Sequence, residues 1–249
     1  VRFGDQVFQE GVDISHTGFF ERLQTDPHFP STAAPAPGTF EDAYRRLVTE
    51  TETVVSIHLI AQYSGIFNAA RLGAEAVADA LTVVPVDSGQ ISLAMGLMAM
   101  VAAEAARGGA SMAEILDLLD DLKPRTHLLA VLDTLDNLRR SGRVNQLVAR
   151  MGDFLRIKPV LHVHQGEVLL SERVRSWGRA QKHLTYTVRS MAPFDRVVLA
   201  HIQRPEATEA LGDALSDVLP PNTFTYEAGI TIGAHIGAGA AGVALIRAP

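Results

Sequence analysis

Ser64-Gly65 stands where a β-branched run at 53–60 gives way to a segment with helical spacing at 65–81. A hydroxyl beside the free N–H groups of a helix N-terminus forms an anion site. A glycine at that point lets a ligand approach the backbone closely. The pattern therefore predicts that Ser64 and Gly65 bind an anion. Ser64 can also cap the helix, and the two roles are compatible.

An acid and a hydroxyl, Asp87-Ser88, follow the next apolar run at 82–86 and precede an apolar helix at 91–107. Such a pair most often caps the following helix. In an open α/β sheet the same place also borders the ligand pocket. We favour capping here and keep the pocket as the alternative.

His162 and His164 lie two residues apart in a predicted strand at 157–164, so both side chains point to the same face. This spacing suits a metal ion, but no third ligand is evident nearby in the sequence. A histidine pair on a solvated hairpin is the commoner arrangement. We therefore expect no metal site.

The stretch from Gly237 to Gly242 matches the glycine pattern G-x-G-x-x-G of dinucleotide-binding proteins. That motif requires a helix after the glycines, whereas the residues at 243–246 are typical of a strand. We interpret the glycines as a turn that lets His235 and the backbone approach a ligand closely. A plain connection between two strands is the alternative.

The elements that must position these residues change character half-way along the chain. In the first half, strands and helices alternate, which predicts a parallel βαβ arrangement, and Ser111 and Glu114 form a capping box for a helix stopped by Pro124. The second half favours a mostly antiparallel sheet with helices on one face. Its predicted elements are a hairpin at 157–170, helices at 173–191 and 205–219, and strands at 196–202, 223–228, 231–236 and 242–247. We predict an α/β fold with an N-terminal domain at 1–122 and a C-terminal α+β domain at 123–249.

Composition narrows the class of protein. The 249 residues are 47% hydrophobic and 20% charged, which is an ordinary globular balance, and the formal net charge of −6 disfavours a nucleic-acid partner. The absence of cysteine excludes disulfides, thiolate metal ligands and cysteine nucleophiles. The longest uncharged apolar stretch, at 91–103, is shorter than the ~20 residues of a membrane span, and no signal-peptide pattern is evident. We expect a cytoplasmic protein without an integral membrane segment.

The apolar helix at 91–107 contains Met95, Met98 and Met100 together with Gly96. A core helix is the default interpretation. The alternative is that the unbranched methionine side chains line a cavity for a flexible apolar ligand. Periodicity does not separate the two.

Six short segments carry a resemblance: Pro30-Ser31-Thr32-Ala33-Ala34-Pro35, Tyr63-Ser64-Gly65-Ile66-Phe67-Asn68-Ala69-Ala70, Val86-Asp87-Ser88 with Gly96 downstream, Ser141-Gly142-Arg143-Val144, Ile157-Lys158-Pro159-Val160-Leu161 and Ile232-Gly233-Ala234-His235-Ile236-Gly237-Ala238-Gly239-Ala240. In this order they resemble motifs of the DegV family of bacterial fatty-acid-binding proteins. No single motif is decisive, but six in the right order cover nearly the whole chain.

The resemblance implies two domains, a parallel Rossmann-like α/β/α domain and a two-layer α+β domain, with a fatty acid in the cleft between them. It implies a lipid carrier that is not an enzyme and that resembles the lipid-binding subunit of a fatty acid kinase system. The implied ligand is palmitate or another long-chain acid, and no cofactor is implied. Matched positions place the carboxylate on Thr32 and Ser64, with Ser31 and Gly65 beside them. Arg143 and His235 complete the polar network, and Arg173 faces the kinase partner.

The chain departs from the family pattern at four places. The family's opening strand with its own D-S motif is not seen, because the sequence starts at Val1. Ala33 replaces a serine, Ile66 replaces a threonine and Ala238 replaces a proline. Two hydroxyls of the family's carboxylate network are therefore replaced by apolar side chains.

Two other classes of function compete with a carrier. A serine hydrolase or acyltransferase would use Ser64 as nucleophile and His235 as base, but the sequence has no G-x-S-x-G elbow and no acid clearly paired with His235. The other is a structural or regulatory module with a vestigial pocket. Replacement of the two family hydroxyls by apolar side chains agrees with this alternative.

Overall fold

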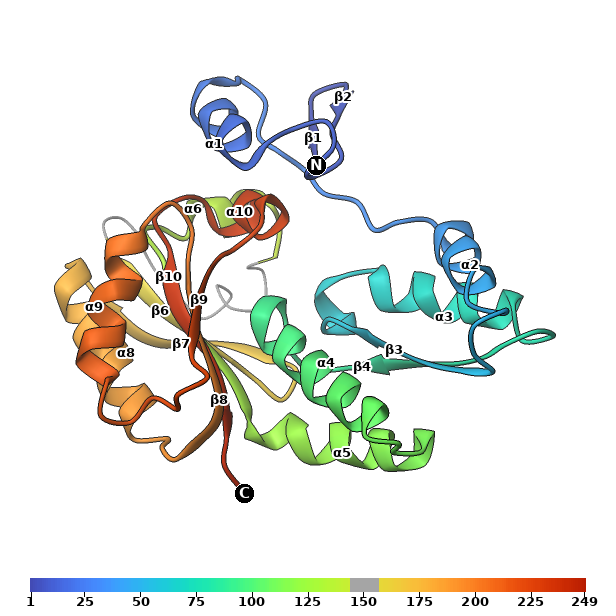
Figure 1. Ribbon diagram of the computed structural model, residues 1–249. Coiled ribbons are helices and arrows are strands. Elements are labelled where there is room, and N and C mark those ends of the chain that lie inside the picture. The colour runs from blue at the N-terminus through green and yellow to red at the C-terminus, as the bar shows by residue number, and fades with distance from the viewer. Residues whose placement is uncertain (144–156) are drawn as a thin grey trace. The chain divides into compact units, whose positions relative to one another are not determined.

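The computed structural model describes residues 1–143 and 157–249. Contacts divide the chain into two compact units, which Figure 1 shows with their elements labelled. Unit 1 comprises Val1–Ala33, His127–Val163 and Val168–Pro249, and unit 2 comprises Ala34–Thr126 and His164–Glu167. The chain thus passes between the units after Ala33, after Thr126 and on either side of the segment His164–Glu167, and residues 1–33 are grouped with the second half. The predicted domains, 1–122 and 123–249, stay a prediction.

Unit 2 contains a two-stranded parallel sheet of β3 and β4, in which Thr53 pairs with Thr82 and His58 with Asp87. The predicted parallel βαβ arrangement is confirmed, because α3 connects the two strands. The elements of this unit are α2 (Pro37–Arg45), β3 (Thr53–His58), the 3₁₀ turn η1 (Ala61–Tyr63), α3 (Ile66–Ala76), β4 (Thr82–Asp87), α4 (Ser92–Arg107) and α5 (Met112–Arg125).

Helices α2 and α3 approach each other closely at Gly73. A Cβ atom there would lie 2.6 Å from the Cβ of Phe40 and 2.9 Å from the backbone nitrogen of Glu41. Tyr44 and Val77 are buried in the small apolar core beside this crossing. Only glycine permits this approach, so the crossing of the two helices depends on it.

The predicted capping box at the start of α5 is confirmed. The N–H of Glu114 donates to Ser111 Oγ over 3.3 Å, and the N–H of Ser111 donates to Glu114 Oε2 over 2.7 Å. The predicted stop at Pro124 was wrong by one residue, since α5 includes Pro124 and ends at Arg125. Thr126 closes the last turn, because its hydroxyl donates to the carbonyl of Leu122.

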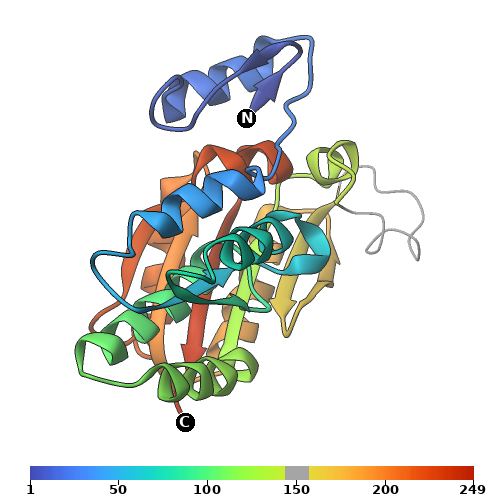
Figure 2. The same ribbon diagram turned by 90° about the vertical axis from the view of Figure 1, so that its right-hand side faces the viewer.

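Unit 1 contains a six-stranded sheet in the order β7-β6-β5-β10-β8-β9. Figure 2 shows β10 between β5 and β8 at the centre of this sheet. β5 pairs antiparallel with β6, β8 pairs antiparallel with β10, and β8 pairs parallel with β9. The described elements of the unit are β1 (Arg2–Phe3), β2 (Gln6–Val7), α1 (His16–Thr25), β5 (Thr126–Val131), α6 (Asp136–Arg140), β6 (Lys158–His164), β7 (Glu167–Val174), α8 (Trp177–Arg189), β8 (Phe194–His201), α9 (Pro205–Leu215), β9 (Phe224–Glu227), α10 (Ile230–Ile236) and β10 (Ala241–Arg247).

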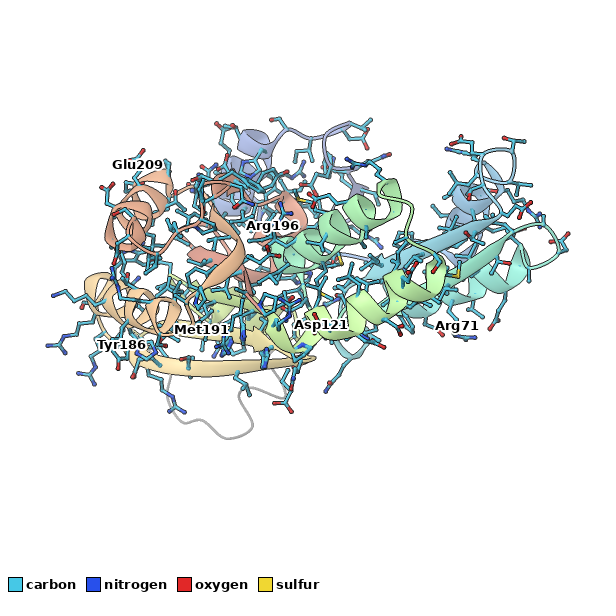
Figure 3. All side chains as sticks on the ribbon, turned by 60° about the horizontal axis from the view of Figure 1, so that its bottom comes forward. Arg71, Asp121, Tyr186, Met191, Arg196 and Glu209 are labelled. Carbon is cyan, nitrogen blue, oxygen red and sulfur yellow. The ribbon has the colours of Figure 1, made fainter. Side chains whose placement is uncertain are left out.

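One face of the sheet packs against α8 and α9. Leu129, Val160 and Val243 of the sheet share an apolar cluster with Leu184 of α8 and Leu211 of α9. On α8, Tyr186, which is labelled in Figure 3, is largely exposed. The parallel sheet of unit 2 and this mostly antiparallel sheet confirm the predicted fold class.

The predicted hairpin at 157–170 is present, although β7 continues further. Gln165 and Gly166 form its turn with φ angles of +48° and +81°. Positive φ at both central residues is what a tight two-residue hairpin turn requires. The N–H of Gly166 donates to the carbonyl of Gly89, so this tip is grouped with unit 2.

Two predicted elements were wrong. The β-branched run at 231–236 is helix α10, not a strand, because Ile230, Gly233 and Ala234 share one face and bury it. Arg173 was predicted to begin a helix but lies in β7, and α8 begins only at Trp177. Exposure alternates along β7, so one face of this strand is covered and the other is exposed. In the sequence, the charged residues on the exposed face look like the polar face of a helix.

In the part of the chain that the structure describes, no helix combines the length and the apolar character needed to span a membrane.

Candidate functional site

Thr32 and His235 form a side-chain hydrogen bond in unit 1, with 2.9 Å between Thr32 Oγ1 and His235 Nε2. Both residues are half-buried. Thr32 follows Ser31, whose backbone exchanges two hydrogen bonds with Arg2 in an antiparallel bridge. The loop that carries Thr32 is therefore held by backbone pairing on the residue before it.

Helix α10 positions His235 at its last turn, just before Gly237. At the start of the helix, Glu10 accepts the N–H of Ile230 over 2.7 Å and the hydroxyl of Thr231 over 3.0 Å. In the middle, Gly233 admits Phe20 of α1, since a Cβ there would lie 2.6 Å from the ring. α10 is thus fixed at two points by the first 33 residues of the chain.

The glycines after α10 have separate structural reasons. Gly237 and Gly239 have φ angles of +76° and +84°, which side chains other than glycine rarely adopt. Gly242 lies within β10, where a Cβ would collide with the backbone carbonyl of Leu129. A helix precedes this motif and a strand follows it, which is the reverse of a dinucleotide-binding turn.

The imidazole of His235 is held neutral. Burial and the nearby positive charge of Arg143 lower the pKa of His235 from 6.5 to about 4. A neutral imidazole has one N–H donor and one lone-pair acceptor. Nε2 is engaged by Thr32, and among the described residues the buried Nδ1 has no hydrogen-bond partner.

Arg143 follows α6 and is anchored locally. Its guanidinium donates to the carbonyl of Ser141 over 2.7 Å, and its backbone N–H donates to the carbonyl of Leu138 over 3.3 Å. The charge of Arg143 reaches His235, so the structure brings Thr32, His235 and Arg143 into one polar group in unit 1. Val144, the last residue of the resembling segment, lies outside the described residues.

Ser64 and Gly65 belong to unit 2, at the beginning of α3. Gly65 occupies the N-cap position, and Ser64 Oγ accepts the N–H of Ile66 over 3.3 Å. Because Ser64 Oγ acts as acceptor in this contact, its hydroxyl proton remains a donor. Ser64 is half-buried and Gly65 is exposed, at a helix end with unsatisfied N–H groups.

Asp87 and Ser88 do not cap α4, contrary to the favoured prediction. The N-cap of α4 is Ile91, which makes no side-chain capping bond. Asp87 instead accepts the N–H of Ala61 over 3.0 Å and that of Gly89 over 2.9 Å. Its carboxylate therefore holds the turns at the carboxyl ends of β3 and β4.

The arrangement around His235 does not supply a catalytic triad. A histidine base needs a third group that orients it, commonly a carboxylate on its second nitrogen. Within residues 1–143 and 157–249, Nδ1 of His235 has no such partner. A pKa of about 4 also makes the ring a poor base near neutral pH.

Comparison with known proteins gives the family. The model of the family described as "Uncharacterised protein, DegV family" matches residues 1–248. The chain belongs to the DegV family. It is 35% identical over 249 residues to a DegV domain-containing protein of Deinococcus radiodurans, covering 98% of this chain and 88% of that protein. It is 30% identical over 249 residues to Protein DegV of Bacillus subtilis, with the same coverage of 98% and 88%.

Solved structures of DegV proteins share the fold. A DegV family protein of Thermus thermophilus, described as fatty acid binding, has a TM-score of 0.89 and 26% identity, covering 99% of this chain and 89% of its own. DegV of Bacillus subtilis, described as a fatty acid binding protein, has a TM-score of 0.87 and 27% identity at the same coverage.

The two remaining residues singled out by the DegV resemblance are exposed. Ser31 makes the backbone bridge beside Thr32, and Arg173 lies on β7 with its N–H donating to Glu172. Sequence reasoning missed Glu10 and Phe20, which fix α10. Neither had a local signal, since a glutamate between a strand and a helix and a phenylalanine in a helix are ordinary, and their partners lie more than 200 positions away.

Proposed function

We propose that this chain binds a long-chain fatty acid without chemically changing it, and that the hydroxyls of Thr32 and Ser64 hold the carboxylate. Arg143 and His235 complete the polar network, with Ser31 and Gly65 beside it. The observation that carries this proposal is the hydrogen bond between Thr32 and a half-buried, neutral His235. The fatty acid binding described for DegV relatives supports it.

The neutral ring suits an anion site through the Thr32 hydroxyl. When Nε2–H donates to Thr32 Oγ1, the hydroxyl proton of Thr32 is left to donate to a ligand oxygen. A carboxylate taken out of water must be hydrogen-bonded, and donors to a charged acceptor make stronger bonds than neutral pairs. In this proposal His235 orients a donor and is not a base.

The apolar part of the ligand is proposed to lie against α4. This helix is apolar nearly all round, yet Met95 and Gly96 are only half-buried. Nothing lies within 4 Å of the position that a Cβ on Gly96 would take. Burying the chain of a C16 acid gives on the order of 12 kcal/mol at ~0.8 kcal/mol per CH₂, before the costs of association and ordering are deducted.

Lipid extraction of the purified protein tests the proposal. Denaturing extraction and native mass spectrometry should find about one long-chain acid per chain, because an apolar site filled with water is costly. Thr32→Val should weaken fatty acid binding about tenfold, since it removes a hydrogen bond to a charged group. The matched control is Thr25→Val, an exposed threonine whose hydroxyl bonds only within α1. Absence of any acid, together with no binding of added palmitate, would reject the carrier.

We further propose that the bound acid is presented to a fatty acid kinase and that Arg173 faces this partner. Arg173 is exposed on β7, as a partner contact requires. Arg173→Ala should lower fatty acid phosphorylation in a mixture with kinase and ATP while lipid affinity is unchanged. Arg107→Ala, which removes an exposed arginine at the end of α4, is the control. Equal phosphorylation by the Arg173 and Arg107 variants would remove Arg173 from the interface.

A further inference from the structure

Strands β5 and β6 bring three histidines to one face of the sheet. In their antiparallel ladder Leu129 pairs with His162 and Leu128 with Val163. Continued by one residue, this register sets His127 opposite His164. Residues directly opposite, and residues two apart on one strand, share a face. The strand pairing itself therefore gathers His127, His162 and His164.

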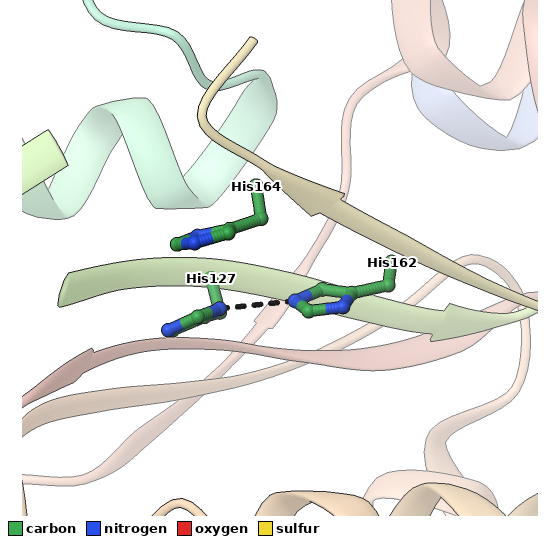
Figure 4. Close-up of side chains that lie close together, drawn as sticks. All are labelled: His127, His162 and His164. Atoms are coloured by element: carbon green, nitrogen blue, oxygen red, sulfur yellow. Dashed lines mark hydrogen bonds between the residues drawn. The ribbon is translucent and has the colours of Figure 1, made fainter. Parts of the chain in front are cut away.

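The side chains follow this backbone placement. The Nδ1 of His127 lies 3.0 Å from the Nε2 of His162, and their rings are stacked with centroids 5.2 Å apart. One ring nitrogen from each of the three residues lies within 4.8 Å of the others. Figure 4 shows the three rings together, with the hydrogen bond that joins His127 and His162. No third ligand is evident near His162 and His164 in the sequence, but the structure brings His127 beside them from the neighbouring strand.

These spacings match those of a metal site. Zinc–nitrogen bonds of about 2.0–2.1 Å in a tetrahedral site separate the ligating nitrogens by about 3.3 Å. The 3.0 Å between Nδ1 of His127 and Nε2 of His162 is close to this separation. A small closing movement of His164 completes a three-imidazole set. His127 is buried and the other two are half-buried, so the cluster is partly exposed to solvent, which can supply a water ligand.

The backbone orients one of the rings as a metal ligand. Nδ1 of His164 lies 3.2 Å from the carbonyl of Thr126. When Nδ1–H donates to that carbonyl, Nε2 keeps its lone pair. Histidines that bind metals commonly donate their other N–H to a backbone carbonyl in this way.

We propose that His127, His162 and His164 bind one Zn²⁺ ion, with a water molecule as the fourth ligand. Imidazole favours zinc and neighbouring transition metals over magnesium or calcium. When zinc binds, two zinc–nitrogen bonds replace the hydrogen bond between His127 and His162. The proton of that hydrogen bond moves to the other nitrogen of the imidazole that carried it. The site is independent of the proposed lipid function.

Titration of the chelator-treated, full-length protein with zinc chloride tests the proposal. Calorimetry should show one ion per chain with a Kd near or below about 1 μM. Cobalt should give the visible absorption of a tetrahedral site. His162→Ala and His164→Ala should each weaken zinc binding at least about tenfold. His28→Ala, which removes an exposed histidine outside the cluster, should leave binding unchanged.

His127 is buried, so His127→Ala can fail through misfolding. The two half-buried positions decide the matter, with circular dichroism and palmitate binding as checks of folding. A wild-type Kd weaker than about 100 μM would overturn the site. So would equal zinc binding by wild type, His162→Ala and His164→Ala. Unchanged palmitate binding in these variants would leave the carrier proposal intact.

Discussion

Thr32 and His235 are 203 positions apart in the sequence and share a hydrogen bond in the structure. Their pairing follows from the position of α10, whose last turn carries the imidazole. The ring is kept neutral by burial and by Arg143. At the residue scale, the consequence is a histidine whose protonation opposes folding.

Acidification should destabilise the protein through His235. Because the pKa is about 4 in the folded state and 6.5 for an unperturbed histidine, the unfolded chain binds the extra proton in between. The contribution of the neutral ring is therefore complete above pH 6.5 and is lost as the pH falls towards 4. Urea unfolding between pH 7 and pH 4.5 should show a shallower loss for His235→Asn than for wild type. His58, whose pKa is also lowered by burial, is present in both proteins and does not affect the comparison. Parallel curves would contradict the assignment.

Arg143→Ala should reduce fatty acid phosphorylation more than fatty acid binding. In the proposed complex the acyl chain would supply most of the binding free energy, whereas a guanidinium near the carboxylate could stabilise charge that develops during phosphoryl transfer. We expect a loss of roughly 100-fold in phosphorylation rate with little change in lipid Kd. Coupled kinase assays and palmitate titrations measure the two quantities. Matching losses in both would show that Arg143 acts through binding alone.

At the scale of elements, close crossings and end caps set the geometry that the residues need. α2 crosses α3 at Gly73, and Glu10 holds the start of α10. The helix crossing and the contact at the start of α10 each depend on one residue. Single substitutions can therefore test both.

Gly73→Ala should destabilise unit 2. The added methyl would meet Phe40 and the backbone of Glu41 at distances that force the helices apart, and overpacking typically costs about 1–3 kcal/mol. Gly96→Ala in α4 is the matched control, since nothing lies within 4 Å of its added atom. Alanine should there stabilise the ligand-free protein by about 0.5–1 kcal/mol through helix propensity. Urea unfolding gives both values, and similar effects of the two changes would refute the close crossing.

Glu10→Ala should loosen α10. It leaves the N–H of Ile230 and the hydroxyl of Thr231 without their carboxylate partner, and loss of a cap costs about 1 kcal/mol. We expect faster amide exchange in α10 and weaker palmitate binding, because His235 lies at the end of that helix. Glu21→Ala, on the exposed side of α1, should change neither. An unchanged exchange rate in α10 would show that the cap is dispensable.

The sequence predicts much of the fold because many elements carry local signals. Continuous apolar runs mark β3 and β4, and the Ser111–Glu114 box marks α5. α10 was misjudged because Ile-Thr-Ile favours a strand locally, while burial against Phe20 favours a helix. The histidine cluster was missed because the register of β5 against β6 is not encoded in either segment alone. Thr32 was found only through the family resemblance, whereas the glycines that follow His235 also pointed to that residue.

For the molecule as a whole, ligand binding should appear as stability. Delipidated protein should melt at a higher temperature when palmitate is added. A ligand at about 100 times its Kd adds about 2.7 kcal/mol to the free energy of unfolding. Differential scanning calorimetry at several palmitate concentrations measures the shift, and a short-chain acid such as butyrate serves as control. No rise with palmitate, or an equal rise with butyrate, would contradict a long-chain site.

The grouping of residues 1–33 with the second half of the chain has a consequence for the order of events during synthesis. Phe3, Phe19 and Phe20 share an apolar cluster with Ile230 and Ala234. During synthesis these aromatic side chains emerge before Ile230 and Ala234, which follow more than 200 residues later. At about 5–20 residues per second, the aromatic side chains wait for about ten seconds or more without Ile230 and Ala234. All of residues 34–126 emerge during that interval. A nascent chain halted before residue 230 should therefore expose the apolar side chains of Phe3, Phe19 and Phe20 to chaperones, and synthesis of α10 should cover them.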